Sequence, residues 1–180
     1  MNLTEIREEQ WPQVKEIYLE AFPKQERKPY GSLRHSVKKG KALLMTATEG
    51  SQVLGFTVLI PYQDMVMVDY LAVSSRIRSR GTGSFIMEQV RSRFADKKVV
   101  LLIERPYEAA ENQAQRLSRR KFYLKNGFDS ANLFISGASG EMEILSCGGI
   151  PTPERYLSLQ KYALGELFFR LSRIRLATGN

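Results

Sequence analysis

The chain has 180 residues, enough for one domain with a sizeable apolar core. Its hydrophobic content of 43% and charged content of 26% are typical of a globular protein. One cysteine, Cys147, excludes an intrachain disulfide, and one histidine, His35, excludes a Cys/His metal cluster. The formal net charge of +8 favours anionic partners such as phosphate-bearing ligands, nucleic acid or an acidic membrane surface, with a basic surface kept for solubility as the alternative.

The amino-terminal residues lack the apolar segment of a signal peptide, and the sequence contains no apolar run long enough to span a membrane. We therefore expect a cytoplasmic protein without a membrane span.

Hydrophobic periodicity and turn residues predict the elements of the first half of the chain. In chain order these are a strand over 3–7, a helix over 8–22, a short helix over 29–40, and strands over 42–48, 53–60 and 65–73. The second half continues with a helix over 84–94, a strand over 99–103, a helix over 109–125, and hairpin strands over 128–136 and 141–147. This alternation predicts an α/β fold, a mixed central sheet with helices on both faces.

The carboxyl-terminal segment differs in composition. Residues 147–153 form a turn-rich linker, and residues 154–175 carry one apolar stripe that predicts a single helix. We expect one domain over 1–147, and over 148–180 a linker and a helical tail packed on that domain. A membrane-surface helix and a dimer face are the alternatives for the tail.

A strand, a basic glycine-bearing loop and a helix follow one another in the middle of the chain. The buried strand Val66–Val73 leads to Arg78, Arg80, Gly81 and Gly83, just before the predicted helix. Main-chain N–H groups converge at a helix start, and glycines permit positive φ and a close approach. Because arginine guanidiniums suit phosphate oxygens, we expect a ligand that carries a pyrophosphate.

Other glycine-loop motifs fit poorly. A P-loop needs a lysine directly after its second glycine, and no lysine follows Gly83. A dinucleotide fingerprint needs a third glycine where Ile86 stands. An ordinary strand-to-helix turn is the remaining structural alternative.

Two segments resemble the GNAT N-acetyltransferases. Leu71-Ala72-Val73 followed by Arg78-x-x-Gly81-x-Gly83 is similar to the acetyl-coenzyme A loop of that superfamily. Downstream, the segment from Lys121 to Phe128 resembles its Phe-Tyr-x-x-x-Gly-Phe motif. The resemblance covers roughly residues 40 to 145 and implies a GNAT-like fold, to which the carboxyl-terminal helix is an addition.

The resemblance also implies how the co-substrate acetyl-coenzyme A would be held, without any metal. The main chain of Leu71, Ala72 and Val73 would bind the pantetheine arm, and the N–H groups of Arg80 through Ser84 would bind the pyrophosphate. The full set of implied coenzyme-binding residues is Leu71, Ala72, Val73, Arg78, Ser79, Arg80, Gly81, Thr82, Gly83, Ser84 and Arg116.

Tyr123 matches the family's tyrosine near the coenzyme sulfur, which implies that it protonates the leaving thiolate. A phenol with an ordinary pKa of about 10 is protonated at neutral pH and can donate to a thiolate, whose conjugate thiol has a pKa of about 8.5. The alternative is an aromatic core residue between Phe122 and Phe128.

The acceptor amine must lose a proton, so the chemistry requires a base. Asp69, just before Tyr70-Leu71, and Glu104, at the end of the next predicted strand, are the candidates, and each could equally be a solvated strand-end charge or a salt-bridge partner. Glu20 and Glu26 are alternatives on the acceptor side.

The sequence departs from the family pattern in the helix before the tyrosine. Arg116 and Arg119 stand where many members have Asn and Ala. These arginines, with Arg120, would bind coenzyme phosphates or an anionic acceptor, or simply face solvent. Cys147 is a further candidate, as a nucleophile that would carry the acetyl group, but it has no adjacent base in the sequence, and a buried small residue is the alternative.

The resemblance implies an enzyme that moves an acetyl group to an amine of a small molecule or peptide by direct attack in a ternary complex. A non-catalytic acyl-coenzyme A-binding or regulatory module is the alternative. No nucleic-acid motif is present, so we expect no specific nucleic-acid partner. A homodimer remains open.

Overall fold

The computed structural model describes residues 1–24, 27–77, 81–106, 111–137 and 140–177. The chain divides into two compact units. The first unit comprises Met1–Pro61 and Val68–Arg93, and the second comprises Tyr62–Met67 and Phe94–Asn180. Strand β4 (Met65–Val73) contributes residues to both units.

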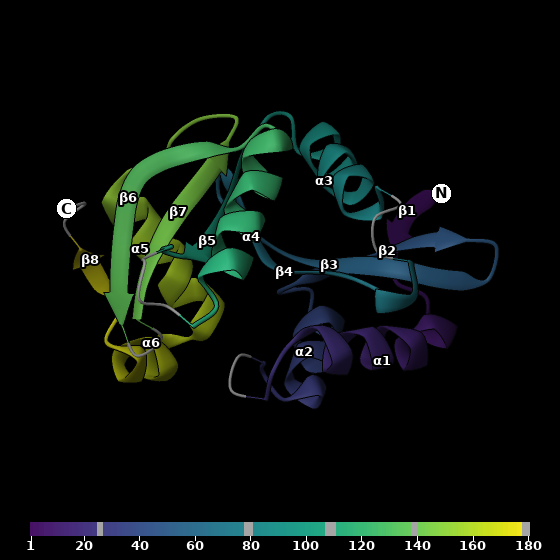
Figure 1. The fold of residues 1–180 in the computed structure, drawn as a ribbon. Helices are drawn as coiled ribbons and strands as arrows, with labels where there is room; N and C mark the ends of the chain where they lie inside the picture. Colours follow the sequence, from purple (N-terminus) through teal and green to yellow (C-terminus); the bar gives the residue numbers. More distant parts are fainter. Residues whose placement is uncertain (25–26, 78–80, 107–110, 138–139, 178–180) are drawn as a thin grey trace. The chain divides into compact units, whose positions relative to one another are not determined.

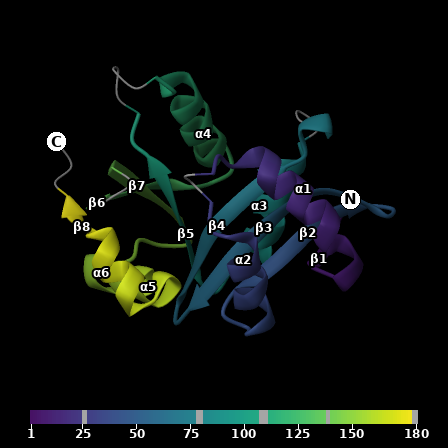
Figure 2. The same ribbon diagram turned by 90° about the horizontal axis from the view of Figure 1, so that it is seen from below.

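The first unit carries a sheet with the strand order β1-β2-β3-β4. Helices α1 and α2 lie on one side of these strands and α3 lies on the other (Figures 1 and 2). Its elements are β1 (Asn2–Glu5), the 3-10 turn η1 (Glu8–Gln10), α1 (Trp11–Ala21), α2 (Tyr30–Lys38), β2 (Leu43–Glu49), β3 (Gln52–Tyr62), β4, the turn η2 (Ser75–Ile77) and α3 (Thr82–Arg93).

Apolar faces of helical period hold this unit together. Helix α1 buries Val14 and Tyr18 completely, and the Tyr18 ring packs against Phe56 of β3 at a centroid distance of 6.3 Å. On the other side, α3 buries an inner face of Ile86, Met87 and Val90, all with 0% exposure. Both helices therefore keep their places by burying apolar surface.

The second unit carries a sheet with the order β5-β7-β6-β8, in which the pairs β5/β7, β6/β7 and β6/β8 are antiparallel. Helices α4 and α5 lie on opposite sides of these strands (Figure 2). Its elements are β5 (Lys98–Glu104), α4 (Gln113–Lys125), β6 (Asp129–Gly137), β7 (Gly140–Cys147), α5 (Pro153–Leu164), α6 (Glu166–Ser172) and β8 (Arg175–Ala177).

The predicted α/β fold class, with strands flanked by helices on both faces, is confirmed, and most predicted elements are present with shifted ends. One expectation is wrong: the tail is not a single helix over 154–175. Gly165, at φ +81°, ends α5, and α6 and strand β8 follow it. Residues with a Cβ rarely adopt such a φ, whereas glycine does so without strain, so the helix ends here. The apolar helical pattern in the sequence continues past this position and therefore does not reveal the break.

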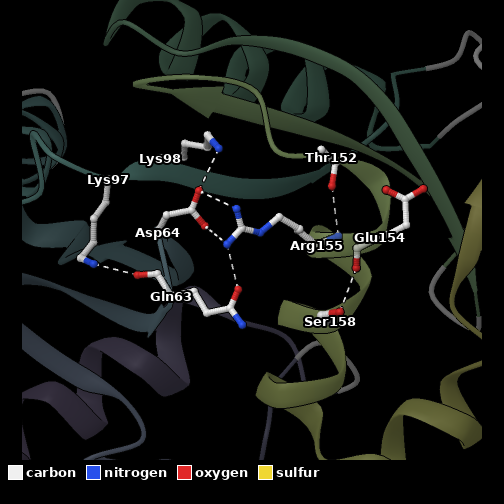
Figure 3. Close-up of polar contacts among 8 residues, drawn as sticks. All are labelled: Gln63, Asp64, Lys97, Lys98, Thr152, Glu154, Arg155 and Ser158. Carbon is white, nitrogen blue, oxygen red and sulfur yellow. Dashed lines mark hydrogen bonds and ion pairs between the residues drawn. The ribbon is translucent and has the colours of Figure 1, made fainter.

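Helix α5 is fixed to the β3–β4 turn by a polar cluster (Figure 3). Arg155 donates to Gln63 Oε1 at 3.0 Å and pairs with Asp64 at 3.0 Å. Lys98 Nζ donates to the same Asp64 carboxylate at 2.9 Å. Helix α5 also buries Tyr156 and Leu159, both with 0% exposure. The domain over 1–147 and the tail over 148–180 packed on it both stay predictions.

Within the described ranges, no helix combines the length and apolar character needed to cross a bilayer.

Candidate active site

In the carboxyl-terminal half of strand β4, buried side chains alternate with half-buried ones. Tyr70 and Ala72 are buried, whereas Asp69, Leu71 and Val73 are half-buried. Thr57 Oγ1 of β3 donates to the Tyr70 carbonyl at 2.9 Å, which fixes the strand's main chain at this point. The predicted coenzyme-binding segment Leu71–Val73 therefore lies in regular strand with part of its surface accessible.

Gly55 of β3 is a positioning residue that was not predicted from the sequence. A Cβ at this glycine would lie 2.6 Å from the Ala72 carbonyl oxygen and 3.3 Å from Ile86 of α3. Only glycine permits this close approach of strand β3 to β4 and α3. The available signal was a glycine inside an otherwise apolar strand, which commonly marks such an approach.

Helix α3 begins two residues earlier than predicted, at Thr82. Gly81 precedes it with φ +78°, and the Phe85 N–H donates to the Gly81 carbonyl at 2.9 Å. The N–H groups of Thr82, Gly83 and Ser84 therefore come before the first intrahelical bond and point out of the helix end.

This helix end has the properties of an anion site. The space where a Gly81 Cβ would lie is open, with nothing within 4 Å, and the helix dipole adds partial positive charge there. The expectation of a positive φ holds for Gly81 but is wrong for Gly83, which is helical because α3 starts before it. The predicted ligands Arg78, Ser79 and Arg80 lie outside the described residues.

The candidate base Asp69 is engaged by a lysine from the α1–α2 connection. Lys28 Nζ donates to Asp69 Oδ2 at 2.6 Å, and the Lys28 main-chain N–H donates to the Tyr70 hydroxyl at 3.1 Å. Tyr18 in turn donates to the Lys28 carbonyl at 2.9 Å. Burial, reinforced by the charge on Lys28, lowers the pKa of Lys41, and the charge on Asp69 opposes this shift. The alternative base Glu20 is exposed, and Glu26 lies outside the described residues.

Tyr123 is the buried residue of α4, with 9% of its surface exposed. Its ring packs edge-on against Phe122 and Phe128, at centroid distances of 5.1 and 5.8 Å. Gly127, at φ +82°, lets the chain turn after the helix so that the Phe128 N–H reaches the Tyr123 carbonyl at 3.2 Å. Burial raises the pKa of the phenol to about 12, so the hydroxyl is protonated at neutral pH.

The second candidate base, Glu104, ends strand β5 and pairs with two arginines of α4. Arg116 Nη2 lies 2.9 Å and Arg119 Nη1 lies 3.4 Å from its carboxylate oxygens. Arg116 also donates to the Arg105 carbonyl at 3.0 Å and to Asn112 Oδ1 at 2.6 Å. The predicted coenzyme ligand Arg116 thus already ties the start of α4 to the end of β5.

A third arginine of α4 is held by the buried Glu143 of β7. Arg120 donates to both oxygens of this carboxylate, at 2.9 and 3.1 Å. Burial raises the pKa of Glu143, but hydrogen bonds from Arg120 and Ser130 and the nearby arginine charges outweigh it and hold that pKa below its usual value. No signal in the sequence singles out Glu143. The role of a charged residue within a strand depends on the residue with which it pairs, and the sequence does not indicate that partner.

The predicted residues thus gather in two groups, one in each unit. The first unit holds Asp69, Leu71–Val73 and the start of α3, and the second unit holds Glu104, Arg116 and Tyr123. Cys147 is half-buried at the end of β7. Among the described residues, no three His, Cys, Asp or Glu side chains gather in a way that could hold a metal ion.

Several solved structures share the fold. A protein from Bacteroides thetaiotaomicron, assigned to the acetyltransferases of the GNAT family, is 17% identical with a TM-score of 0.75, over 94% of this chain and 99% of its own. An aminoglycoside 6'-N-acetyltransferase complexed with coenzyme A is 14% identical with a TM-score of 0.66, over 85% and 99%. The ribosomal-protein-S18-alanine N-acetyltransferase from Escherichia coli is 15% identical with a TM-score of 0.62, over 81% and 92%.

At the sequence level, no curated protein matches the chain. The family model of the acetyltransferase (GNAT) domain matches residues 40–130, half of the chain, and this match includes β4, the start of α3 and Tyr123. The chain therefore belongs to the GNAT family and is an acyltransferase.

Proposed function

We propose that the protein transfers the acetyl group of acetyl-coenzyme A to a primary amine by direct attack in a ternary complex. The observation that carries this proposal is the start of α3, where Gly81 at φ +78° opens a helix end suited to a pyrophosphate. Coenzyme A is present in the related aminoglycoside acetyltransferase structure, which supports the same co-substrate here.

The main chain of Leu71, Ala72 and Val73 would bind the pantetheine arm. Strand β4 supports this role because its Tyr70 carbonyl is fixed by Thr57 of β3 and its alternate side chains are half-buried. The N–H groups of Thr82, Gly83 and Ser84 would bind the pyrophosphate oxygens. Both contacts use main-chain groups, whose geometry is set by the fold and not by side-chain rotamers.

In the reaction, the neutral amine attacks the thioester carbonyl carbon, a C–N bond forms and the C–S bond breaks. Tyr123 would donate its phenolic proton to the departing thiolate. A phenol with a pKa of about 12 is protonated before the reaction and recovers its proton from solvent afterwards. The aromatic neighbours Phe122 and Phe128 fix its ring, which supports a positioned donor.

The proton released by the amine would pass to Asp69 or Glu104, directly or through water. Both carboxylates have cationic partners: Lys28 lies 2.6 Å from Asp69, and Arg116 lies 2.9 Å from Glu104. Proton transfer to either carboxylate therefore requires its ion pair to break. Asp69→Asn and Glu104→Gln distinguish the two. Loss of the base lowers kcat and removes the acidic limb of the pH profile, whereas loss of a structural pair changes stability alone.

Release of free thiol from acetyl-coenzyme A, measured across a panel of amines, tests the function. The panel should include aminoglycosides and peptides with a free N-terminus. The names of two similar proteins, an aminoglycoside 6'-N-acetyltransferase and a ribosomal-protein-S18-alanine N-acetyltransferase, point to a small-molecule amine and to a protein acceptor. We expect amine-dependent thiol release by the intact chain. Coenzyme binding without amine-dependent release for any acceptor would favour the acyl-coenzyme A-binding module instead.

A further inference from the structure

Helix α6 presents large apolar side chains to solvent. Leu167, Phe168 and Leu171 are 67%, 66% and 65% exposed. Their spacing of i, i+1 and i+4 brings them to one side of the helix. Leu176 of the adjoining strand β8 is 44% exposed as well. Together, Leu167, Phe168, Leu171 and Leu176 form the α6 face.

The α6 face stands on a fixed scaffold. A Cβ at Gly137 of β6 would lie 2.8 Å from the Ser172 carbonyl oxygen, so the end of α6 sits directly on this strand. Strand β8 then pairs with β6 in the register Ile135↔Leu176. Phe169 and Ile174 are half-buried, which leaves the α6 face on the outer side of a packed segment.

Basic residues are interspersed in the sequence with the residues of the α6 face. Arg170, Arg173 and Arg175 are all exposed. The acidic residue of this segment, Glu166, is held by Arg170 at 3.0 Å and by Lys161 at 3.2 Å. Arginines next to exposed leucine and phenylalanine are typical of segments that lie in the headgroup region of an anionic bilayer.

An apolar face of this kind could be covered by a second copy of the chain or by a lipid surface, and charge favours the lipid surface. A second copy of the chain would bring its own Arg173 and Arg175 against those of the first, since Arg170 is already paired with Glu166, and each chain carries a net charge of +8. Like charges oppose that contact, whereas a surface of anionic headgroups attracts them.

We propose that α6 and β8 dock on an anionic lipid surface, with Leu167, Phe168 and Leu171 entering the headgroup region and the neighbouring arginines contacting lipid phosphates. This surface goes beyond the acetyl-transfer function and does not depend on it. Docking of this kind is reversible, because a few apolar side chains and a basic patch give modest affinity.

Flotation of the intact chain with vesicles tests the proposal. One vesicle preparation contains phosphatidylcholine alone, and the other contains equal parts of phosphatidylcholine and phosphatidylglycerol. We expect the protein to float with the anionic vesicles, to bind the neutral ones less, and to dissociate as salt is raised.

The double substitution Phe168→Ser with Leu171→Ser should lower the affinity for anionic vesicles about tenfold, because two apolar side chains no longer enter the interface. The matched control Leu19→Ser removes a leucine of α1 that is 43% exposed and should leave binding unchanged. Circular dichroism verifies that each variant is folded, and Leu167→Gln provides a second test should the double variant unfold.

Three results would overturn the proposal. The first is no flotation of the wild-type chain, and the second is flotation that neither α6 variant reduces, which would assign binding to another basic surface. The third is a wild-type dimer that the α6 variants convert to a monomer, because a second copy would then occupy the face.

Discussion

Helices α3 and α4 both belong to the matched family segment, yet they are held in opposite ways. Helix α3 buries an aliphatic face of Ile86, Met87 and Val90, each with 0% exposure. Helix α4, all of whose residues the structure describes, buries Tyr123 alone and is tied to its sheet by arginine–glutamate pairs. Apolar packing thus places one helix, and ion pairs place the other.

The difference matches what each helix would contribute to the reaction. Helix α3 would contribute the main-chain N–H groups of its first turn, so the role of its side chains is to fix the position of the helix by packing. Helix α4 offers one side chain, the Tyr123 hydroxyl. Changes that remove this hydroxyl should lower turnover strongly, whereas changes near α3 should weaken coenzyme binding only where they alter the backbone.

Tyr123→Phe is expected to have the largest effect. It removes the proposed proton donor and keeps the buried ring, so kcat should fall about 100-fold while coenzyme affinity stays the same. Thiol release and calorimetry measure the two quantities. Tyr162→Phe, at an exposed tyrosine of α5, is the matched control and should retain full turnover. A normal kcat in the Tyr123→Phe variant would contradict the role of proton donor and leave Tyr123 as an aromatic residue of the core.

Glu143→Gln should weaken the anchoring of α4. It leaves Arg120 without its carboxylate, and because the glutamate side chain is 6% exposed while the arginine is 33% exposed, we expect a loss of about 2 kcal/mol in the free energy of unfolding. Denaturant unfolding at neutral pH measures this loss. An unchanged midpoint would show that the pair does not hold α4.

The same pair predicts a pH dependence. The pKa of Glu143 is lower in the folded chain than its ordinary value of 4.5, so the carboxylate stabilises the fold above that pH. This contribution disappears as the pH falls below 4.5 and through the folded-state pKa. The difference in stability between wild type and Glu143→Gln should therefore shrink on acidification, and a constant difference would contradict the assignment.

Gly81→Val tests the start of α3. Valine is strained at φ +78°, so the turn must relax and redirect the N–H groups that follow, which should weaken coenzyme binding about tenfold. Gly50→Val is the matched control: this glycine has φ +58° in the β2–β3 turn and equally open surroundings. Equal losses of coenzyme affinity in both variants would show a general effect of strain.

Leu71→Val is expected to have the smallest effect. The contacts proposed for this half-buried residue of β4 are main-chain contacts, and valine suits a strand. Coenzyme affinity should stay within about twofold of wild type by calorimetry. A much larger loss would mean that the leucine side chain itself contacts the ligand.

Local signals in the sequence were sufficient to predict strand β4, the glycine turn and the start of α3 to within two residues. They failed at Gly165, because the apolar stripe continues across a break that depends on backbone conformation. They also could not pair Lys28 with Asp69, residues 41 positions apart in the chain. Such contacts form only through tertiary packing, as does the partner that gives Glu143 its role.

Titration calorimetry of the intact, folded chain with acetyl-coenzyme A tests the central claim most directly. We predict saturable binding to one site per chain, weakened by Gly81→Val and preserved in Tyr123→Phe. Absence of binding heat and of any affinity for the coenzyme in a well-folded sample would contradict it.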